Sequence, residues 1–343
     1  MRPRPAISFR TGGRRMPFVS IRDLRVAFDG VRVLHGIDLD VGRGEAVGLV
    51  GESGCGKSVT WLAALGLLPG KARVTGSVRI EGRELIGARA SEMEAVRGAR
   101  IAMIFQDPSS SLNPVHRVGR QIAESLRLHR GLRGAQARAE AIRLLDMVGI
   151  PAAATRIDLY PHEFSGGQCQ RVMIAMALAG QPDLLIADEP TTALDATIQA
   201  QILDLLSAIR RETGMAMVFI SHDLGAVSAV CDRAAVMYAG RIVETNDVAR
   251  LFAAPRHPYT RGLFDAIPEL DSGRTRLVPI EGTVPDPRNL PQGCAFAPRC
   301  VRATAFCTAY APDLKPQPEG GQVACFHPDP AAARARKPQA VPA

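Results

Sequence analysis

The chain has 343 residues, enough for one large domain or two ordinary ones, and a formal net charge of +8 at pH 7. Apolar residues make up 46% and charged residues 22%, as in soluble globular proteins, and no apolar run approaches the roughly 18 residues of a membrane span. The N-terminus is rich in arginine but lacks the apolar segment of a secretory signal, so we expect a protein that stays in the cytosol.

Much of the excess positive charge lies at the two ends of the chain. We expect a disordered basic extension over residues 1–16, with Met16 as an alternative start, and a disordered tail rich in alanine, proline and arginine over residues 329–343. Between them, no helix-like or strand-like segment carries basic residues interleaved with aromatic ones. Solvated tails are therefore favoured over a nucleic-acid partner.

The first elements alternate apolar and polar residues, as half-buried strands do. Residues 18–30 and 31–41 predict a hairpin that turns at Asp29-Gly30. A second pair of strands is predicted around residues 74–80 and 101–105.

A glycine-rich stretch follows the hairpin and has the G-x-x-x-x-G-K-S pattern of a phosphate-binding loop. An apolar strand (residues 45–50) precedes it and a helical pattern (residues 59–65) follows, which is the context the motif requires. Glycine lets the backbone N–H groups converge on one anion, and the N-terminus of the helix adds positive charge there. The residues predicted to hold a nucleoside triphosphate are Gly51, Glu52, Ser53, Gly54, Cys55, Gly56, Lys57, Ser58 and Val59. Lys57 would reach the β- and γ-phosphates and Ser58 would hold Mg²⁺.

Helical periodicity replaces the strand pattern over residues 110–178, so we expect a helical insert there. Strands and helices then alternate: a buried strand over residues 184–187, a helix over 198–210, a strand over 216–220 and a hairpin over 236–243. This order predicts an α/β core with a mostly parallel sheet. We place this nucleotide domain at residues 17–254.

Polar residues follow the buried strands, where open α/β sheets bind ligands. Asp188 would bind Mg²⁺ and Glu189 would activate the attacking water as general base. Gln106 and His222 occupy similar positions after other strands, although each alone would be an ordinary loop residue. Phe28 could stack on an adenine, although a single phenylalanine is usually part of a core.

A second anion-binding pattern, Ser165-Gly166-Gly167-Gln168, opens a helix further along the chain. One triphosphate needs one such turn. The second turn is therefore either structural or serves a nucleotide held by another subunit.

Taken in order, these motifs resemble the nucleotide-binding subunits of ABC transporters over about residues 17–327. The resemblance implies the P-loop NTPase fold of an ABC nucleotide-binding domain, with a helical insert, an antiparallel β subdomain and a small C-terminal module. It also implies a head-to-tail dimer in which the phosphate loop of one subunit and the 165–168 turn of the other enclose each ATP. By the same resemblance, Phe28 stacks on adenine, Gln106 senses Mg²⁺ and the membrane partner, His222 contacts the γ-phosphate, and Asp195 bridges the two sites. Phe164 departs from the leucine that usually opens the turn.

Three further stretches are similar to the dipeptide/oligopeptide importer branch: residues 104–114, 160–162 and 257–263. That branch implies an ATPase on the cytoplasmic face of the inner membrane. Its partners would be a second, homologous ATPase, two transmembrane permeases and an extracytoplasmic solute-binding protein. Import of nickel or another small solute, and a soluble ABC ATPase without a transport role, remain as alternatives.

The loop-rich module expected over residues 255–328 contains four cysteines, Cys294, Cys300, Cys307 and Cys325, in the spacing C-x5-C-x6-C-x17-C. Structural zinc sites usually carry paired C-x₂₋₄-C knuckles, and none is present. The irregular spacing favours a four-thiolate iron–sulfur cluster, and the resemblance implies a [4Fe–4S] cluster; Zn²⁺ and unligated thiols are the alternatives.

Overall fold

A computed structural model describes residues 16–192, 194–266 and 279–330 of this chain. The disordered extension predicted over residues 1–16 and the disordered tail predicted over residues 329–343 lie outside these residues except for Met16, Asp329 and Pro330, and Ala193 also lies outside them. No helix in the described ranges is long and apolar enough to cross a membrane.

The N-terminal strands form a four-stranded antiparallel sheet in the order β2-β1-β4-β5. Its strands are β1 (Val19–Phe28), β2 (Val31–Val41), β4 (Ala72–Ile80) and β5 (Arg83–Glu84). The pairing of β1 with β2 confirms the predicted hairpin. The buried residues of β1 and β2 alternate with more exposed ones and face the core, as in an antiparallel sheet with one face exposed to solvent; they include Val19, Ile21, Leu34 and Leu39.

The larger sheet has eight strands in the order β11-β12-β10-β9-β3-β8-β7-β6. Its central strands pair in parallel and its β10–β12 end is antiparallel. The strands are β3 (Ala46–Val50), β6 (Ile101–Ile104), β7 (Leu184–Asp188), β8 (Ala216–Ser221), β9 (Arg233–Tyr238), β10 (Arg241–Asp247), β11 (Lys315–Pro316) and β12 (Gln322–Val323). Strands β3, β7 and β8 are buried along their whole length, as parallel strands covered on both faces are.

One predicted pairing is wrong. The strands expected as a pair around residues 74–80 and 101–105 belong to different sheets, because β4 pairs with β1 and β6 pairs with β7. Both segments have a strand pattern, but the partner of a strand is decided by long-range packing that a local pattern does not contain.

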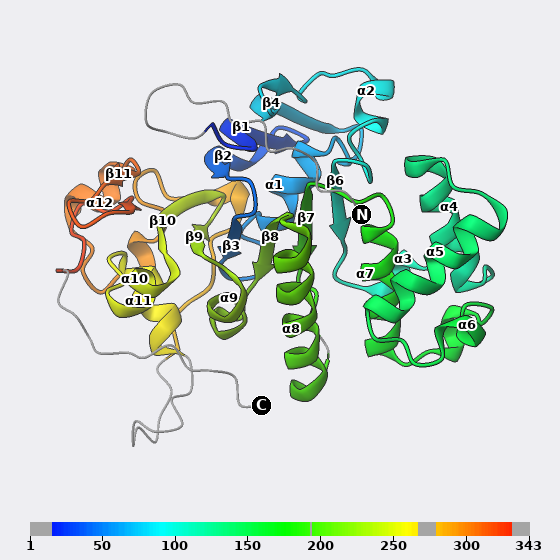
Figure 1. Ribbon diagram of the computed structural model, residues 1–343. Helices are drawn as coiled ribbons and strands as arrows, with labels where there is room; N and C mark the ends of the chain where they lie inside the picture. The colour runs from blue at the N-terminus through cyan, green and yellow to red at the C-terminus, as the bar shows by residue number, and fades with distance from the viewer. Residues whose placement is uncertain (1–15, 193, 267–278, 331–343) are drawn as a thin grey trace.

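Helices cover the large sheet and build a separate lobe beside it (Figure 1). They are α1 (Lys57–Ala64), α2 (Ala90–Glu94), α3 (Pro108–Ser111), α4 (Val118–Arg130), α5 (Gly134–Met147), α6 (Ala153–Arg156), η1 (Pro161–Glu163), α7 (Gly166–Leu178), α8 (Ala196–Thr213), α9 (Leu224–Val230), α10 (Val248–Ala253), α11 (Pro258–Asp265), η2 (Pro287–Asn289), η3 (Ala297–Arg299) and α12 (Ala305–Ala309). The lobe consists of α4 to α6 with α7 against it, at the right of Figure 1. The periodic apolar residues Val118, Ile122 and Leu126 are fully buried in it, as their spacing predicted.

The segments after β10 lie at the opposite end of the large sheet (Figure 1). Strand β12 extends the sheet by pairing with β10. On β10, the buried Glu244 accepts hydrogen bonds from the backbone N–H groups of Arg256 and His257, each at 2.8 Å. His257 in turn caps α11, because its Nδ1 accepts the N–H of Tyr259 at 3.0 Å. The C-terminal segments are therefore held to the nucleotide domain by buried polar contacts.

The burial of His257 predicts that the folded protein loses stability in acid. Burial lowers the pKa of His257 from 6.5 to about 4, while a hydrogen bond with the Ala324 backbone opposes the shift. The histidine therefore takes up a proton more readily in the unfolded chain, and the free energy of unfolding falls as the pH drops from 6.5 towards 4. The shift corresponds to about 3 kcal/mol over that interval. Urea unfolding at several pH values measures it.

The variant His257→Asn is the control, because asparagine keeps an acceptor at the helix N-cap but does not titrate. We expect the free energy of unfolding of this variant to fall by about 3 kcal/mol less than that of the wild type between pH 6.5 and pH 4. Burial also lowers the pKa of His35 to about 4. Because His35 is present in both proteins, its effect on the free energy of unfolding is the same in both and cancels in their difference. Equal pH slopes for the two proteins would show that His257 is not the titrating group.

Candidate functional site

The phosphate loop joins β3 to α1 at the carboxyl end of the parallel strands. Gly51 has φ +153°, and a Cβ there would lie 2.2 Å from the Met237 carbonyl oxygen. Gly56 has φ +105°, and its Cβ would lie 2.6 Å from the Leu34 side chain. Only glycine therefore lets the loop curl this closely against β2 and β9.

Lys57 is 5% exposed, and its ammonium group lies inside the curl of the loop. Its Nζ donates to the carbonyl oxygens of Gly51 at 2.8 Å and Glu52 at 3.1 Å. These contacts hold the charge beside the backbone N–H groups at the start of α1, where the helix also favours an anion.

Ser58 and Asp188 are brought together from elements 130 residues apart. The Ser58 hydroxyl donates to Asp188 Oδ1 at 2.8 Å. Burial raises the pKa of Asp188, and the Ser58 hydrogen bond partly opposes this. A hydroxyl and a carboxylate side by side are the oxygen donors that Mg²⁺ prefers.

Glu189 lies at the centre of a polar cluster at the same sheet edge. Its Oε2 accepts hydrogen bonds from Thr192 Oγ1 at 2.9 Å and Gln106 Nε2 at 3.2 Å, and lies 3.3 Å from His222 Nδ1. Its backbone has φ +47°, a left-handed conformation that is uncommon for glutamate and is typical of functional sites. The structure thus brings together Gln106, Glu189 and His222.

Thr192 was not predicted. The sequence does contain a signal for it: a hydroxyl three residues after Glu189 can fold back onto that carboxylate through a turn, as Thr192 does.

The 165–168 turn caps α7. The backbone N–H of Gln168 donates to the Ser165 hydroxyl at 3.4 Å, and the backbone N–H of Ser165 donates to the Gln168 side-chain oxygen at 3.2 Å. Asp195 caps α8 by accepting the N–H of Ile198 at 3.0 Å. Gly167 packs on Ile198, since a Cβ at Gly167 would lie 2.8 Å from it. In the described part of the chain, no hydrogen bond joins this turn to the phosphate loop.

Phe28 ends β1 and is partly buried against the core of the small sheet. Stacking of this ring on adenine stays a prediction.

Two residues that sequence reasoning missed contact the phosphate loop from the C-terminal segments. The Tyr259 hydroxyl accepts the backbone N–H of Glu52 at 2.8 Å. Arg299 pairs with the Glu52 carboxylate, with Nη1–Oε2 at 2.6 Å and Nη2–Oε1 at 3.0 Å. The run that contains Tyr259 was noticed only as a mark of the importer branch, and nothing local distinguishes Arg299 from the other arginines.

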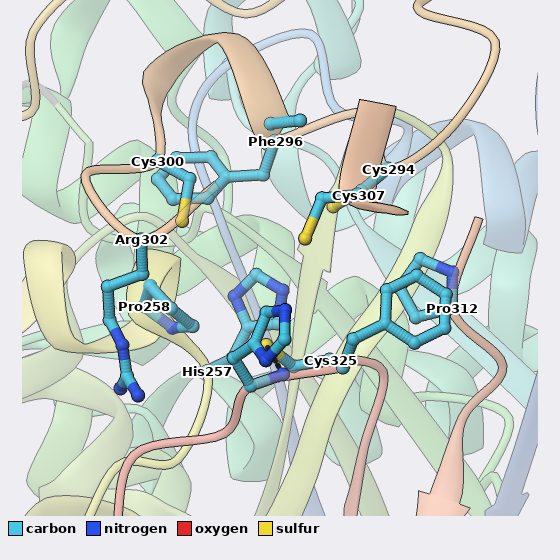
Figure 2. A pocket seen from close by; sticks show the side chains of 12 residues that line it. His257, Pro258, Cys294, Phe296, Cys300, Arg302, Cys307, Pro312 and Cys325 are labelled. Carbon is cyan, nitrogen blue, oxygen red and sulfur yellow. Dashed lines mark hydrogen bonds between the residues drawn. The ribbon is translucent and has the colours of Figure 1, made fainter. Parts of the chain in front are cut away.

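The four predicted cysteine ligands gather around one small cavity of about 20 Å³, with His257 and His327 (Figure 2). All four are free thiols. Burial raises the pKa of Cys294 and Cys300, and that of Cys325 to about 11, so these groups are protonated at neutral pH. The backbone N–H of Cys294 donates to the Cys307 carbonyl at 2.8 Å, and the N–H of His327 lies 3.4 Å from the Cys325 sulfur.

The prediction of an iron–sulfur cluster is wrong, and the zinc alternative finds no support. Across residues 16–192, 194–266 and 279–330, no group of three or more histidine, cysteine, aspartate or glutamate side chains is placed to hold a metal ion. These cysteines take part in the packing of the segment instead: Cys307 is buried, and Cys294 and Cys300 are partly buried against the hydrophobic core. Their spacing in the sequence showed that four thiols were available, but the directions of the side chains are set by the tertiary structure.

Comparison with known proteins agrees with this geometry. The family described as ABC transporter matches residues 34–192, and the oligopeptide/dipeptide transporter C-terminal region matches residues 243–307. The chain is 48% identical over 314 residues to the oligopeptide transport ATP-binding protein OppD of Salmonella typhimurium, covering 90% of this chain and 93% of that protein. The chain belongs to the ABC transporter ATPases. A protein of Brucella abortus named as a peptide import ATP-binding protein is 52% identical over 307 residues, covering 88% of this chain and 91% of the relative.

Solved structures of ABC ATPases share the fold. An ATP-binding cassette solved as a dimer in a post-hydrolysis state with ADP and phosphate matches with a TM-score of 0.60 and 26% identity, over 67% of this chain and 98% of that one. The cbiO1 protein of Clostridium perfringens matches with a TM-score of 0.60 and 27% identity, over 69% and 90%. The predicted family, ATPase activity and α/β fold of this ABC ATPase are confirmed, while the cysteine-containing module is not specifically matched by these structures.

Proposed function

We propose that this ABC ATPase powers the import of peptides. The observation that carries the proposal is the joining of a hydrolytic site, Glu189 with His222 and Gln106, to a C-terminal segment of the oligopeptide/dipeptide transporter type. The names of its relatives, which describe peptide transport in several bacteria, support this substrate class.

In this proposal the phosphate loop binds the triphosphate of ATP through its backbone N–H groups and Lys57. Ser58 and Asp188, whose oxygens lie side by side, would hold Mg²⁺ together with Gln106, and the ion would neutralise phosphate charge. Phe28 stacks on the adenine.

Glu189 acts as the general base: it orients the attacking water and accepts its proton as the water oxygen bonds to the γ-phosphorus. The bond from the γ-phosphorus to the β–γ bridging oxygen breaks, and ADP and phosphate leave. His222 lies beside the same carboxylate oxygen and would contact the γ-phosphate. Gln106 and Thr192 hold the carboxylate in place through its Oε2. A carboxylate held in one orientation by its neighbours supports this role as general base.

The 165–168 turn and Asp195 act on the ATP of a second subunit. The Ser165 hydroxyl at the N-terminus of α7 would bind phosphate there, which supports a head-to-tail dimer. We propose that the second subunit is a homologous ATPase and that the pair drives two transmembrane permeases. The complex would lie on the cytoplasmic face of the inner membrane and receive peptides from an extracytoplasmic solute-binding protein.

Affinity isolation of the tagged chain from mildly solubilised native membranes tests this assembly. The expected result is recovery of two permeases and a second ATPase, together with loss of peptide uptake in cells that lack the chain. The tagged Glu189→Gln form, which should keep ATP bound, strengthens the recovery of the second ATPase. Recovery of ribosomal proteins, or intact peptide uptake without the chain, would contradict the proposal.

A further inference from the structure

The C-terminal segments hold the phosphate loop at one residue, Glu52. This glutamate is the second residue of the loop and is bound at both its main chain and its side chain by residues more than 200 positions later. The ATP-binding assignment uses the loop but does not account for these contacts.

The contact with Arg299 uses the full hydrogen-bonding capacity of the guanidinium. Nη1 and Nη2 form a bidentate pair with the Glu52 carboxylate. Nη1 also donates to the Tyr238 hydroxyl and Nη2 to the Ile280 carbonyl oxygen, each at 3.3 Å, while Nε donates to the Glu281 carbonyl oxygen at 2.9 Å. The Arg299 side chain is 4% exposed, whereas that of Glu52 is 30% exposed. The arginine is thus fixed in its segment and presents its charge to the loop.

The contact with Tyr259 is equally well supported. The ring is fully buried, with its centroid 4.6 Å from that of Tyr238 and 5.4 Å from that of Phe296. Its hydroxyl accepts the Glu52 N–H, and its own backbone N–H is held by the side chain of His257. A rigid aromatic cluster thus sets the position of the Glu52 backbone.

These contacts continue directly to the phosphate-binding lysine. Lys57 Nζ donates to the carbonyl oxygens of Gly51 and Glu52. The Gly51 carbonyl belongs to the same peptide group as the Glu52 N–H that Tyr259 binds. A shift of Glu52 would move both carbonyl groups and with them the ammonium group. The Glu52 carboxylate is also a negative charge on a loop that must receive a triphosphate, and Arg299 neutralises it.

We propose that Arg299 and Tyr259 are positioning residues of the ATP site, which hold the phosphate loop through Glu52 and cancel the charge of its carboxylate. The C-terminal segment, whose Cys300 follows Arg299 directly, is thereby part of the nucleotide site. This inference rests on the proposed binding of ATP at residues 51–58.

Equilibrium binding of a fluorescent ATP analogue with Mg²⁺ to the full chain tests the proposal. Arg299→Gln leaves the Glu52 carboxylate unpaired, and we expect affinity for the analogue to fall about 10-fold, the effect of losing one charge-assisted pair. Tyr259→Phe removes only the hydroxyl and should weaken binding about 3-fold. The matched control Arg288→Gln removes an exposed arginine that pairs with Asp286 in the same segment and should bind as the wild type does.

The double variant Arg299→Gln/Glu52→Gln separates the loss of charge cancellation from general damage to the fold. Without the carboxylate the repulsion of phosphate disappears, so we expect affinity to return to within about 3-fold of the wild type. Arg299→Lys, which keeps the charge but not the two-pronged geometry, should lie between Arg299→Gln and the wild type, and it serves with Tyr259→Phe if Arg299→Gln does not fold.

The proposal would be overturned if Arg299→Gln bound the analogue with wild-type affinity. If that variant does not fold, wild-type affinity in both Arg299→Lys and Tyr259→Phe would overturn it. So would a double variant that binds as weakly as Arg299→Gln alone. Failure of the wild-type chain itself to bind the analogue would instead overturn the assignment of ATP to the phosphate loop.

Discussion

Replacing Glu189 with glutamine will lower ATP turnover by about 10²–10⁴-fold, the range that a general base contributes. Glutamine has nearly the same shape and can still bond to Thr192 and Gln106, but it cannot accept a proton from water. Affinity for ATP should stay close to that of the wild type, because the contacts of Lys57, Ser58 and Asp188 are unchanged. Phosphate release in the assembled complex measures turnover, and equilibrium binding of ATP measures affinity.

The matched control is Glu212→Gln, which removes an exposed carboxylate near the end of α8 and should leave turnover unchanged. Undiminished phosphate release by the Glu189 variant would remove this residue as the base. A parallel loss of ATP affinity would indicate that the carboxylate acts in binding instead.

We expect replacing Lys57 with alanine to weaken ATP binding by about 100-fold, because in the proposed site the buried ammonium group donates charge-assisted hydrogen bonds to the phosphates. The same change leaves the carbonyl oxygens of Gly51 and Glu52 without their donor, so thermal unfolding of the variant is followed in parallel. Titration calorimetry with ATP and Mg²⁺ measures the loss.

Lys71→Ala is the control for this variant, since Lys71 is exposed and lies outside the loop. A folded Lys57 variant that binds ATP with wild-type affinity would show that the triphosphate does not occupy residues 51–58.

Much of the nucleotide site was predictable because its signals are local. The G-x-x-x-x-G-K-S pattern requires glycine where the loop curls, and the structure shows why at Gly51 and Gly56. Asp188 and Glu189 follow a continuously apolar run, which predicted a buried strand ending at a ligand edge, and β7 ends there. Such patterns depend on the backbone conformation of a few neighbouring residues, which the residue types themselves determine.

Other features could not be predicted because they depend on which segments meet. The four cysteines have a spacing that favours a metal site, but the fold leaves them as free thiols around a cavity of about 20 Å³, with no metal-binding group among the described residues. The strand around residues 74–80 has a clear pattern, yet its partner is β1 and not β6. Side-chain direction and strand pairing are both properties of the assembled core.

The sequence by itself determined the phosphate loop, the order of strands and helices and the ABC family, because each depends on short patterns with a specific physical requirement. Only the tertiary structure decided that Glu52 is held by Arg299 and Tyr259, and that the cysteines do not form a metal centre. The physical reason is distance along the chain: a contact between residues more than 200 positions apart leaves no periodic or local trace, and exists only once the folded core brings the two segments together.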